Sequence, residues 1–282
     1  MDKPLISIVI ATYNRPLLLA ELVESLSRQT FKNFEVIIVN DYGENVDRVK
    51  ALYNDLDIKI IEMEKNSKHV LARNAGIQQV KGEWVMLIDD DDLLVPTHIE
   101  TMLKESKEFD LLYSDVEIVR FELKNQRRVP VERRLFAYEL DLQGMRKFST
   151  FVSSGCLYRR ELHNKIGLFD PAVHNYWDWD FFLRVVEKFR VKRLAVAGVL
   201  YDFSDFNNNQ SKDLEPRKFY LNRLCEKHNL GELPSKNFFL LLEEPEVKQR
   251  QAESKVLWDG KSFVSRLVRE KAGIGHLDRS VQ

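Results

Sequence analysis

Residues Trp84-Val85-Met86-Leu87-Ile88-Asp89-Asp90-Asp91-Asp92 form an apolar run that ends in four consecutive carboxylates. The apolar part is typical of a strand buried in a parallel sheet, and ligands of open α/β sheets bind at the carboxyl ends of such strands. Adjacent carboxylates raise one another's pKa, and a hard divalent cation with oxygen ligands relieves that cost. The stretch therefore predicts a metal site. An acidic surface loop that caps a helix beginning near Pro96 is the alternative.

The sequence around this stretch alternates between strand-like and helix-like patterns, which predicts a parallel sheet with crossover helices. The expected strands cover residues 5–11, 35–39, 58–61, 84–88, 110–120, 128–132, 148–152, 156–159 and 191–201. The expected helices begin at Pro16 and cover 46–53, 70–80, 96–107 and 179–189. The predicted fold class is α/β, a mostly parallel central sheet flanked by helices.

Composition and the absence of a linker predict the number of domains, the class of partner and the cellular location of the protein. No Gly/Ser- or Pro-rich linker divides the 282 residues, so we expect one domain, 1–214, and a C-terminal helical extension, 215–282. The formal net charge of -1 provides no global field for nucleic acid, and none is expected as a partner. Cys156 and Cys225 fit reduced thiols, and the N-terminus is unlike a signal peptide. We expect the protein in the cytoplasm, and a location at the inner face of the membrane is the alternative.

The amphipathic stretch 255–271 is expected to form a helix that docks on the domain. The alternative is that this stretch makes peripheral contact with a membrane or a partner. A homodimer formed through the C-terminal helices is a further alternative.

Polar side chains follow the predicted strands at one edge of the sheet. Thr12-Tyr13-Asn14-Arg15 follows the first strand, Asn40-Asp41-Tyr42-Gly43 follows the second, and Arg73 lies in the helix before Trp84. Taken singly, each segment is explained by a turn or a solvated charge. Because the carboxyl ends of parallel strands share one edge, we expect a single crevice that collects them with the acidic stretch.

Together, these segments resemble the inverting family 2 glycosyltransferases, which have the GT-A (Rossmann-like nucleotide-binding) fold. The resemblance is carried, in collinear order, by residues 6–15, 36–41, 71–76, 82–92, 155–160, 167–170 and 177–180. It implies a hexosyltransferase-type enzyme that moves a sugar from a nucleoside diphosphate to an acceptor hydroxyl in polysaccharide or glycoconjugate assembly. Residues 1–120 would form the nucleotide-sugar-binding half and residues 121–214 the acceptor-binding half.

The resemblance also implies roles for the donor-side residues. Asp91, with Asp89, would hold Mn²⁺ or Mg²⁺ against the diphosphate, and Asp92 would cap the following helix. Asp41 would accept a hydrogen bond from the base, which favours a UDP-sugar donor. The residues expected to bind the nucleotide sugar are Thr12, Tyr13, Asn14, Arg15, Asp41, Arg73, Asp89 and Asp90.

On the acceptor side, the resemblance places the general base at Asp178, in Trp177-Asp178-Trp179-Asp180. Flanking rings limit the hydration of a carboxylate and raise its pKa, which suits a base. Trp177, Trp179 and Asp180 are the candidate contacts to a saccharide, lipid-linked or protein-linked acceptor. Capping of the helix that starts at Trp179 is the alternative role for Asp178.

Two departures from the family pattern bear on these roles. Tyr42 stands where a glycine usually follows Asp41. Residues 201–205 lack the histidine that ligates the metal in many relatives, and Asp205 is the candidate to replace it. Two other functions stay open. A sugar-nucleotide nucleotidyltransferase would need a glycine-rich loop after the first strand, which Thr12 to Pro16 is not. A non-catalytic carbohydrate-binding module would need neither Asp91 nor Asp178.

Overall fold

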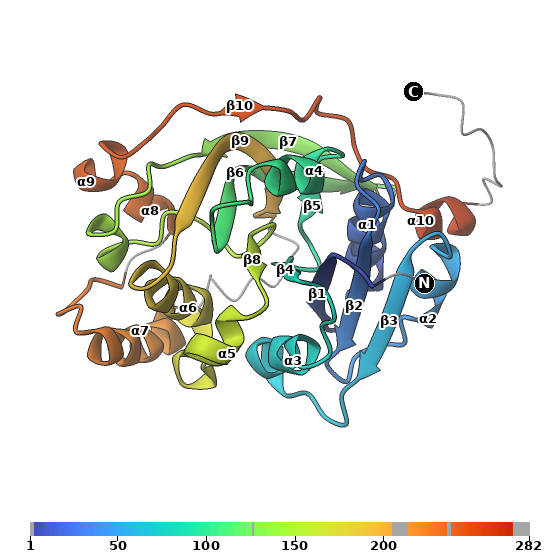
Figure 1. The fold of residues 1–282 in the computed structure, drawn as a ribbon. Coiled ribbons are helices and arrows are strands. Elements are labelled where there is room, and N and C mark those ends of the chain that lie inside the picture. The colour runs from blue at the N-terminus through green and yellow to red at the C-terminus, as the bar shows by residue number, and fades with distance from the viewer. Residues whose placement is uncertain (1–2, 126, 205–213, 236–237, 273–282) are drawn as a thin grey trace.

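A mixed sheet forms the centre of the protein in a computed structural model that describes residues 3–125, 127–204, 214–235 and 238–272. Its strand order is β10-β9-β6-β8-β4-β1-β2-β3, with β5 paired to β9 and β7 paired to β6 (Figure 1). The strands of the first half, all parallel, are β1 (Ile6–Thr12), β2 (Phe34–Asn40), β3 (Asp57–Glu62) and β4 (Trp84–Leu87). The predicted α/β class is confirmed.

Helices cover both faces of this parallel half. Successive side chains of a strand point to opposite faces, and β1 accordingly divides its residues between two core clusters: Ile8 lies with α1 (Pro16–Ser27), and Val9 lies with α3 (Lys68–Ile77). Gly76 lets α3 approach the sheet closely, because a Cβ there would meet Val9 Cγ1 at 2.5 Å. Helix α2 (Asp47–Leu52), also of this half, and α4 (His98–Lys104), which packs on β6 and β9, lie where they were predicted.

The second half adds longer strands with mixed directions. Its strands are β5 (Leu93–Leu94), β6 (Leu111–Lys124), β7 (Arg127–Phe136), β8 (Leu157–Arg159) and β9 (Val191–Asp202). β6 and β7 form an antiparallel hairpin, β8 is antiparallel to both β4 and β6, and β9 runs parallel to β6. The helical elements are the 3-10 helices η1 (Gly144–Arg146) and η2 (Pro171–Tyr176) and the α-helices α5 (Leu162–Ile166) and α6 (Trp177–Val186).

The strand predicted at residues 148–152 is wrong. These residues have no regular secondary structure, yet Phe148 and Phe151 are buried, one in each core cluster. A short apolar run has the same composition whether it is a strand or a buried connection, so its pattern cannot separate the two.

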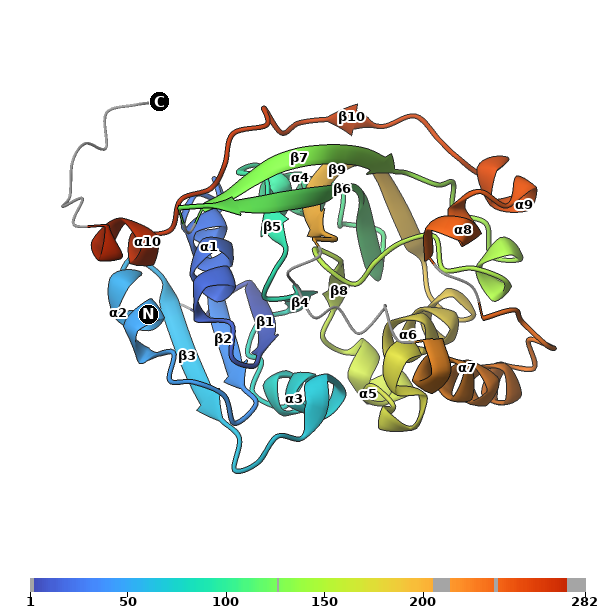
Figure 2. The ribbon, with the colours of Figure 1, turned by 180° about the vertical axis from the view of Figure 1, so that it is seen from behind.

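From α9 onward, the C-terminal segment crosses the top of the molecule and reaches α10 beside α2 (Figures 1 and 2). It contains α7 (Leu214–His228), α8 (Phe238–Leu242), α9 (Pro245–Lys248), β10 (Lys255–Val256) and α10 (Arg266–Lys271). A continuous helix over 255–271 is therefore wrong, because the chain first adds β10 to the sheet edge. The stretch does dock on the domain. The domain boundary at residue 214 stays a prediction.

The docked stretch is held by apolar and ionic contacts. Trp258 and Phe263 are buried with β6, β9 and β5, and Leu267 lies in the main core. Arg266 donates to the Leu52 carbonyl at 2.8 Å and pairs with Asp55. Within the described ranges, no helix has the length and apolarity needed to cross a bilayer.

We expect Trp258→Ala to lower the free energy of unfolding by about 3 kcal/mol, because it removes a buried ring that packs on Phe121 and under Arg133. Val256→Ala is the matched control, since Val256 in β10 is 46% exposed, and its effect should stay within about 0.5 kcal/mol. Urea unfolding followed by circular dichroism measures both. Equal small effects would show that the docked segment does not stabilise the domain.

Candidate active site

The candidate site lies where the order of the parallel strands reverses. β1 stands between β2 and β4, and ligands of open α/β sheets bind outside the carboxyl ends of the strands at such a point. A cleft of about 1090 Å³ opens there. The predicted residues that line it are Thr12, Tyr13, Asn14, Arg15, Asp41, Arg73, Asp89, Asp90, Asp91, Trp177 and Asp178.

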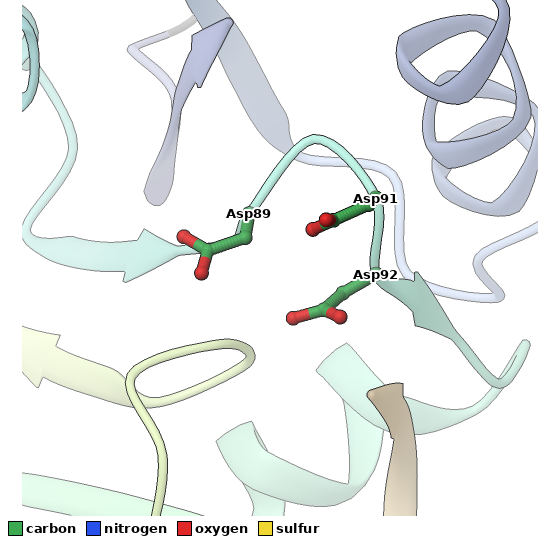
Figure 3. A group of neighbouring side chains, drawn as sticks. All are labelled: Asp89, Asp91 and Asp92. Atoms are coloured by element: carbon green, nitrogen blue, oxygen red, sulfur yellow. The ribbon is translucent and has the colours of Figure 1, made fainter. Parts of the chain in front are cut away.

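The acidic stretch is a buried turn and not a surface loop. The Asp92 N–H donates to the Asp89 carbonyl at 3.1 Å, and the side chains of Asp90, Asp91 and Asp92 are all buried. Figure 3 shows the chain leaving β4 at Asp89 and turning back through Asp91 and Asp92. The alternative of an acidic surface loop that caps a helix is therefore wrong.

Asp92 has a structural role that differs from the predicted helix cap. Helix α4 begins six residues later, at His98. One carboxylate oxygen of Asp92 accepts from the Ser154 hydroxyl, and the other accepts from the Asp202 N–H at 2.9 Å. Asp92 therefore ties the acidic turn to β9 and to the connection before β8.

The carboxylates suit a hard divalent cation. Asp89, Asp91 and Asp92 each offer an oxygen, all within 4.8 Å of one another (Figure 3). Burial, and then the neighbouring Asp90, raises the pKa of Asp91, so a further positive charge would favour its ionised form. Hydrogen bonds engage both oxygens of Asp92, whereas arginines engage only one oxygen each of Asp89 and Asp91, so Asp89 and Asp91 are the better ligands. The donor set fits Mn²⁺ or Mg²⁺.

Residues at the end of β1 contact the acidic turn directly. The Thr12 hydroxyl donates to Asp90 at 2.7 Å. Arg15 pairs with Asp90 at 3.2 Å and with Asp91 at 3.0 Å. Asn14 has a left-handed backbone, with φ of 54°, and its side chain accepts from the Glu44 N–H at 2.8 Å. Tyr13 is exposed at the cleft.

Asp41 anchors the loop that leads into α3. Its two oxygens accept from the backbone N–H groups of Ser67 at 2.7 Å and Lys68 at 2.8 Å. Each carboxylate oxygen has a second lone pair, so these bonds leave acceptor capacity on the cleft side. Tyr42, the departure from the family pattern, has φ of 63° and an exposed side chain.

Arg73 connects the donor side of the cleft to the acceptor side. Its guanidinium pairs with Asp89, donates to the His69 carbonyl at 3.1 Å and lies 4.5 Å from the centre of the Trp177 ring. Burial, and then the charge of Arg73, lowers the pKa of His69 to about 2, so this histidine is neutral. Arg73 is therefore the cation that holds Asp89 beside Trp177.

Asp178 is the second residue of α6, and it lines the cleft. One oxygen accepts from the Trp179 N–H at 2.8 Å. Burial raises the pKa of Asp178 to about 6; Asp89 adds to the rise, and Arg73 opposes it. A carboxylate with this pKa is ionised at neutral pH and basic enough to accept a proton.

Trp179 and Asp180 do not line the cleft, and their predicted contacts to the acceptor stay a prediction. Trp179 donates to the Met145 carbonyl at 2.7 Å and packs against α7. Asp180 is 0% exposed and pairs with Arg184, Lys227 and His228. Burial by itself would raise the pKa of Asp180, but these cationic and hydrogen-bonding partners lower it to about 2. Both side chains join α6 to its neighbours.

Arg128 is a cleft residue that sequence reasoning missed. This arginine of β7 is 2% exposed, pairs with Glu21 and with Asp202 (2.8 Å), and donates to the Asp91 carbonyl at 2.5 Å. The sequence suggested a strand at this position but gave no sign of a buried guanidinium. Asp205, proposed in place of the family's histidine, lies outside the described residues.

Sequence comparisons identify the proteins to which this chain is similar. The family model described as "Glycosyl transferase family 2" matches residues 7–167. An uncharacterized glycosyltransferase of Bacillus subtilis, YwdF, is 59% identical over 265 residues, which cover 94% of this chain and 99% of the relative.

Two solved structures have a similar fold. S. aureus TarS 1-349 in complex with UDP-GlcNAc superposes with a TM-score of 0.64 at 21% identity, over 79% of this chain and 66% of that one. The mannosyltransferase PcManGT from Pyrobaculum calidifontis, in complex with GDP-Man and Mn²⁺, gives a TM-score of 0.59 at 16% identity, over 82% and 66%. At these identities the likeness shows the fold alone.

We expect Arg128→Met to lower the free energy of unfolding by about 3–5 kcal/mol, because it leaves the buried carboxylates of Glu21 and Asp202 without their cation. Arg134→Met is the matched control on the same strand. It breaks an exposed pair with Glu243 and should cost about 0–1 kcal/mol. Chemical denaturation of the two variants measures the difference. Equal costs would contradict the role given to Arg128.

Proposed function

Because the chain belongs to glycosyl transferase family 2 and is a glycosyltransferase with the GT-A fold, we propose that it is a metal-dependent, inverting enzyme that uses a UDP-sugar. The acceptor is a hydroxyl group of a growing polysaccharide or glycoconjugate. One observation carries the proposal: a single cleft is lined by the acidic turn, by the arginines that contact it (Arg15, Arg73 and Arg128) and by Asp178.

The donor side of the cleft has the groups that a nucleoside diphosphate needs. Asp41 is an acceptor for the imino group of uracil, and Tyr13 offers an exposed ring in the same cleft. Arg15 and Arg73 are guanidinium donors for phosphate oxygens. Solved structures of the same fold hold UDP-GlcNAc and GDP-Man, which supports a nucleotide-sugar donor.

Asp91 and Asp89 would hold Mn²⁺ or Mg²⁺ in this cleft. When bound, the ion stabilises the negative charge that develops on the leaving diphosphate. Arg73 fixes the carboxylate of Asp89, and Arg128 fixes the backbone of Asp91. These contacts keep the two ligands in place before the donor arrives, which lowers the cost of organising the site.

Asp178 is the proposed general base. Inversion requires the acceptor oxygen to attack the anomeric carbon from the side opposite the diphosphate, and the hydroxyl proton must leave during attack. Asp178 accepts that proton on the carboxylate oxygen that does not bond the Trp179 N–H. The ring of Trp177 limits water at the cleft wall.

A donor screen tests the proposed function. With Mn²⁺ and a panel of nucleotide sugars, we expect release of UDP from one UDP-sugar, and we expect Asp91→Asn to abolish metal-dependent donor binding because it removes a charged ligand. The control is Asp259→Asn, since Asp259 is exposed outside the cleft, and it should behave as wild type. Pyrophosphate exchange would instead indicate a nucleotidyltransferase, and binding without turnover a carbohydrate-binding module.

The pH dependence of transfer tests Asp178. Because its pKa is raised to about 6 and the base must be ionised, kcat/KM should fall roughly tenfold per pH unit below 6 and level off above it. Asp178→Asn should keep UDP affinity and lose transfer by about 10²–10⁴-fold. Asp170→Asn, outside the main cleft, is the control. Transfer at the normal rate by Asp178→Asn would reject the base assignment.

A further inference from the structure

The guanidinium of Arg15 and the proposed divalent ion would compete for the same carboxylate, that of Asp91. The guanidinium of Arg15 lies 3.0 Å from Asp91 Oδ2 and 3.2 Å from Asp90 Oδ1. Asp91 is also the proposed ligand of the divalent ion. A guanidinium that neutralises this carboxylate competes with a metal ion, both for the oxygen and through repulsion between like charges.

The acidic turn does not depend on Arg15 for its shape. Asp90 is also held by the Thr12 hydroxyl at 2.7 Å. The carbonyl of Asp91 is held by Arg128 at 2.5 Å, and Asp92 is held by Ser154 and by the Asp202 N–H. Because these bonds do not involve Arg15, its guanidinium can leave while the carboxylates stay in place.

Arg15 is also well placed for a phosphate group. It is the residue that precedes α1, a helix of 12 residues, and its side chain lies at the cleft. No side chain caps this helix, and Leu17 and Leu18 of its first turn line the same cleft. The amino end of a helix favours negative charge, so an anion bound here meets both the helix dipole and the guanidinium.

We propose that Arg15 is a displaceable counter-ion that couples binding of the divalent cation to binding of the donor diphosphate. The proposal rests on the metal-dependent function given above and adds the order in which the diphosphate and the metal ion bind. The diphosphate attracts the guanidinium away from Asp91, and the freed carboxylate then accepts the metal ion. Metal alone binds weakly, because it must displace Arg15 without an anion to receive it.

Coupling of this kind is reciprocal, so UDP strengthens Mn²⁺ binding by the factor by which Mn²⁺ strengthens UDP binding. Direct contact between the ion and the diphosphate contributes to that factor in any such site. The contribution of Arg15 can be told apart from this direct contact, because it also acts when UDP is absent. Removing the guanidinium should then strengthen Mn²⁺ binding.

The experiment measures Mn²⁺ affinity by electron paramagnetic resonance, with and without saturating UDP, for wild type and Arg15→Gln. Without UDP, Arg15→Gln should bind Mn²⁺ roughly tenfold more tightly than wild type, and the enhancement by UDP should fall by a similar factor. Arg15→Lys keeps a positive charge and should retain weak binding of Mn²⁺ alone. Lys271→Gln is the matched control, since Lys271 lines the same cleft and its loss lowers the general positive charge equally.

Three results would overturn the coupling: unchanged Mn²⁺ affinity in Arg15→Gln, weaker affinity, or an equal gain in Lys271→Gln. Circular dichroism spectra of the variants show whether each is folded. Failure of the underlying function has a different signature, because wild type would then bind no Mn²⁺ even with saturating UDP. That result would remove the metal dependence and the coupling together.

Discussion

Concentrated negative charge at the end of β4 is the constraint on which the rest of the site depends. Asp90, Asp91 and Asp92 are buried side by side, and burial of like charges is unfavourable unless cations and hydrogen bonds offset it. Arginines from separate elements meet the turn: Arg15 before α1 pairs with Asp90 and Asp91, Arg73 in α3 pairs with the adjoining Asp89, and Arg128 in β7 donates to the Asp91 carbonyl. The acidic turn therefore holds together parts of the chain that are far apart in sequence.

This constraint explains why both halves of the chain are needed to form one site. The parallel half supplies the acidic turn and two of the arginines, while β7 and β9 supply Arg128 and Asp202. Arg128 adds a second buried ion network, with Glu21 of α1, beneath the acidic turn. A change in either half alters the electrostatic environment of the cleft, so stability and proposed function are coupled.

The same excess of charge suits the chemistry of sugar transfer. A site in which several carboxylates pair with arginines offers oxygen ligands to a divalent ion and guanidinium donors to a diphosphate. Asp178 stands apart from these pairs. Its raised pKa follows from burial, with Asp89 as a neighbour and the Trp179 N–H as a hydrogen-bond donor. In the proposed function, the ionised groups of the cleft would bind the donor, and Asp178 would accept the proton of the acceptor hydroxyl.

The sequence alone determined the α/β class, the parallel first half and most of the named side chains that line the cleft. Buried parallel strands have continuous apolar runs, and polar residues directly after β1, β2 and β4 must meet because the carboxyl ends of parallel strands share one edge.

Only the tertiary structure decided which partners these side chains have. Trp179 and Asp180 contact α7 and do not line the cleft. Asp92 bonds to β9, and residues 148–152 form a buried connection. Arg128 came from a strand whose pairing places its guanidinium under Asp91, a contact between residues 37 positions apart. Local pattern fixes which face a side chain takes, whereas its partner depends on contacts across the fold that no short window of sequence contains.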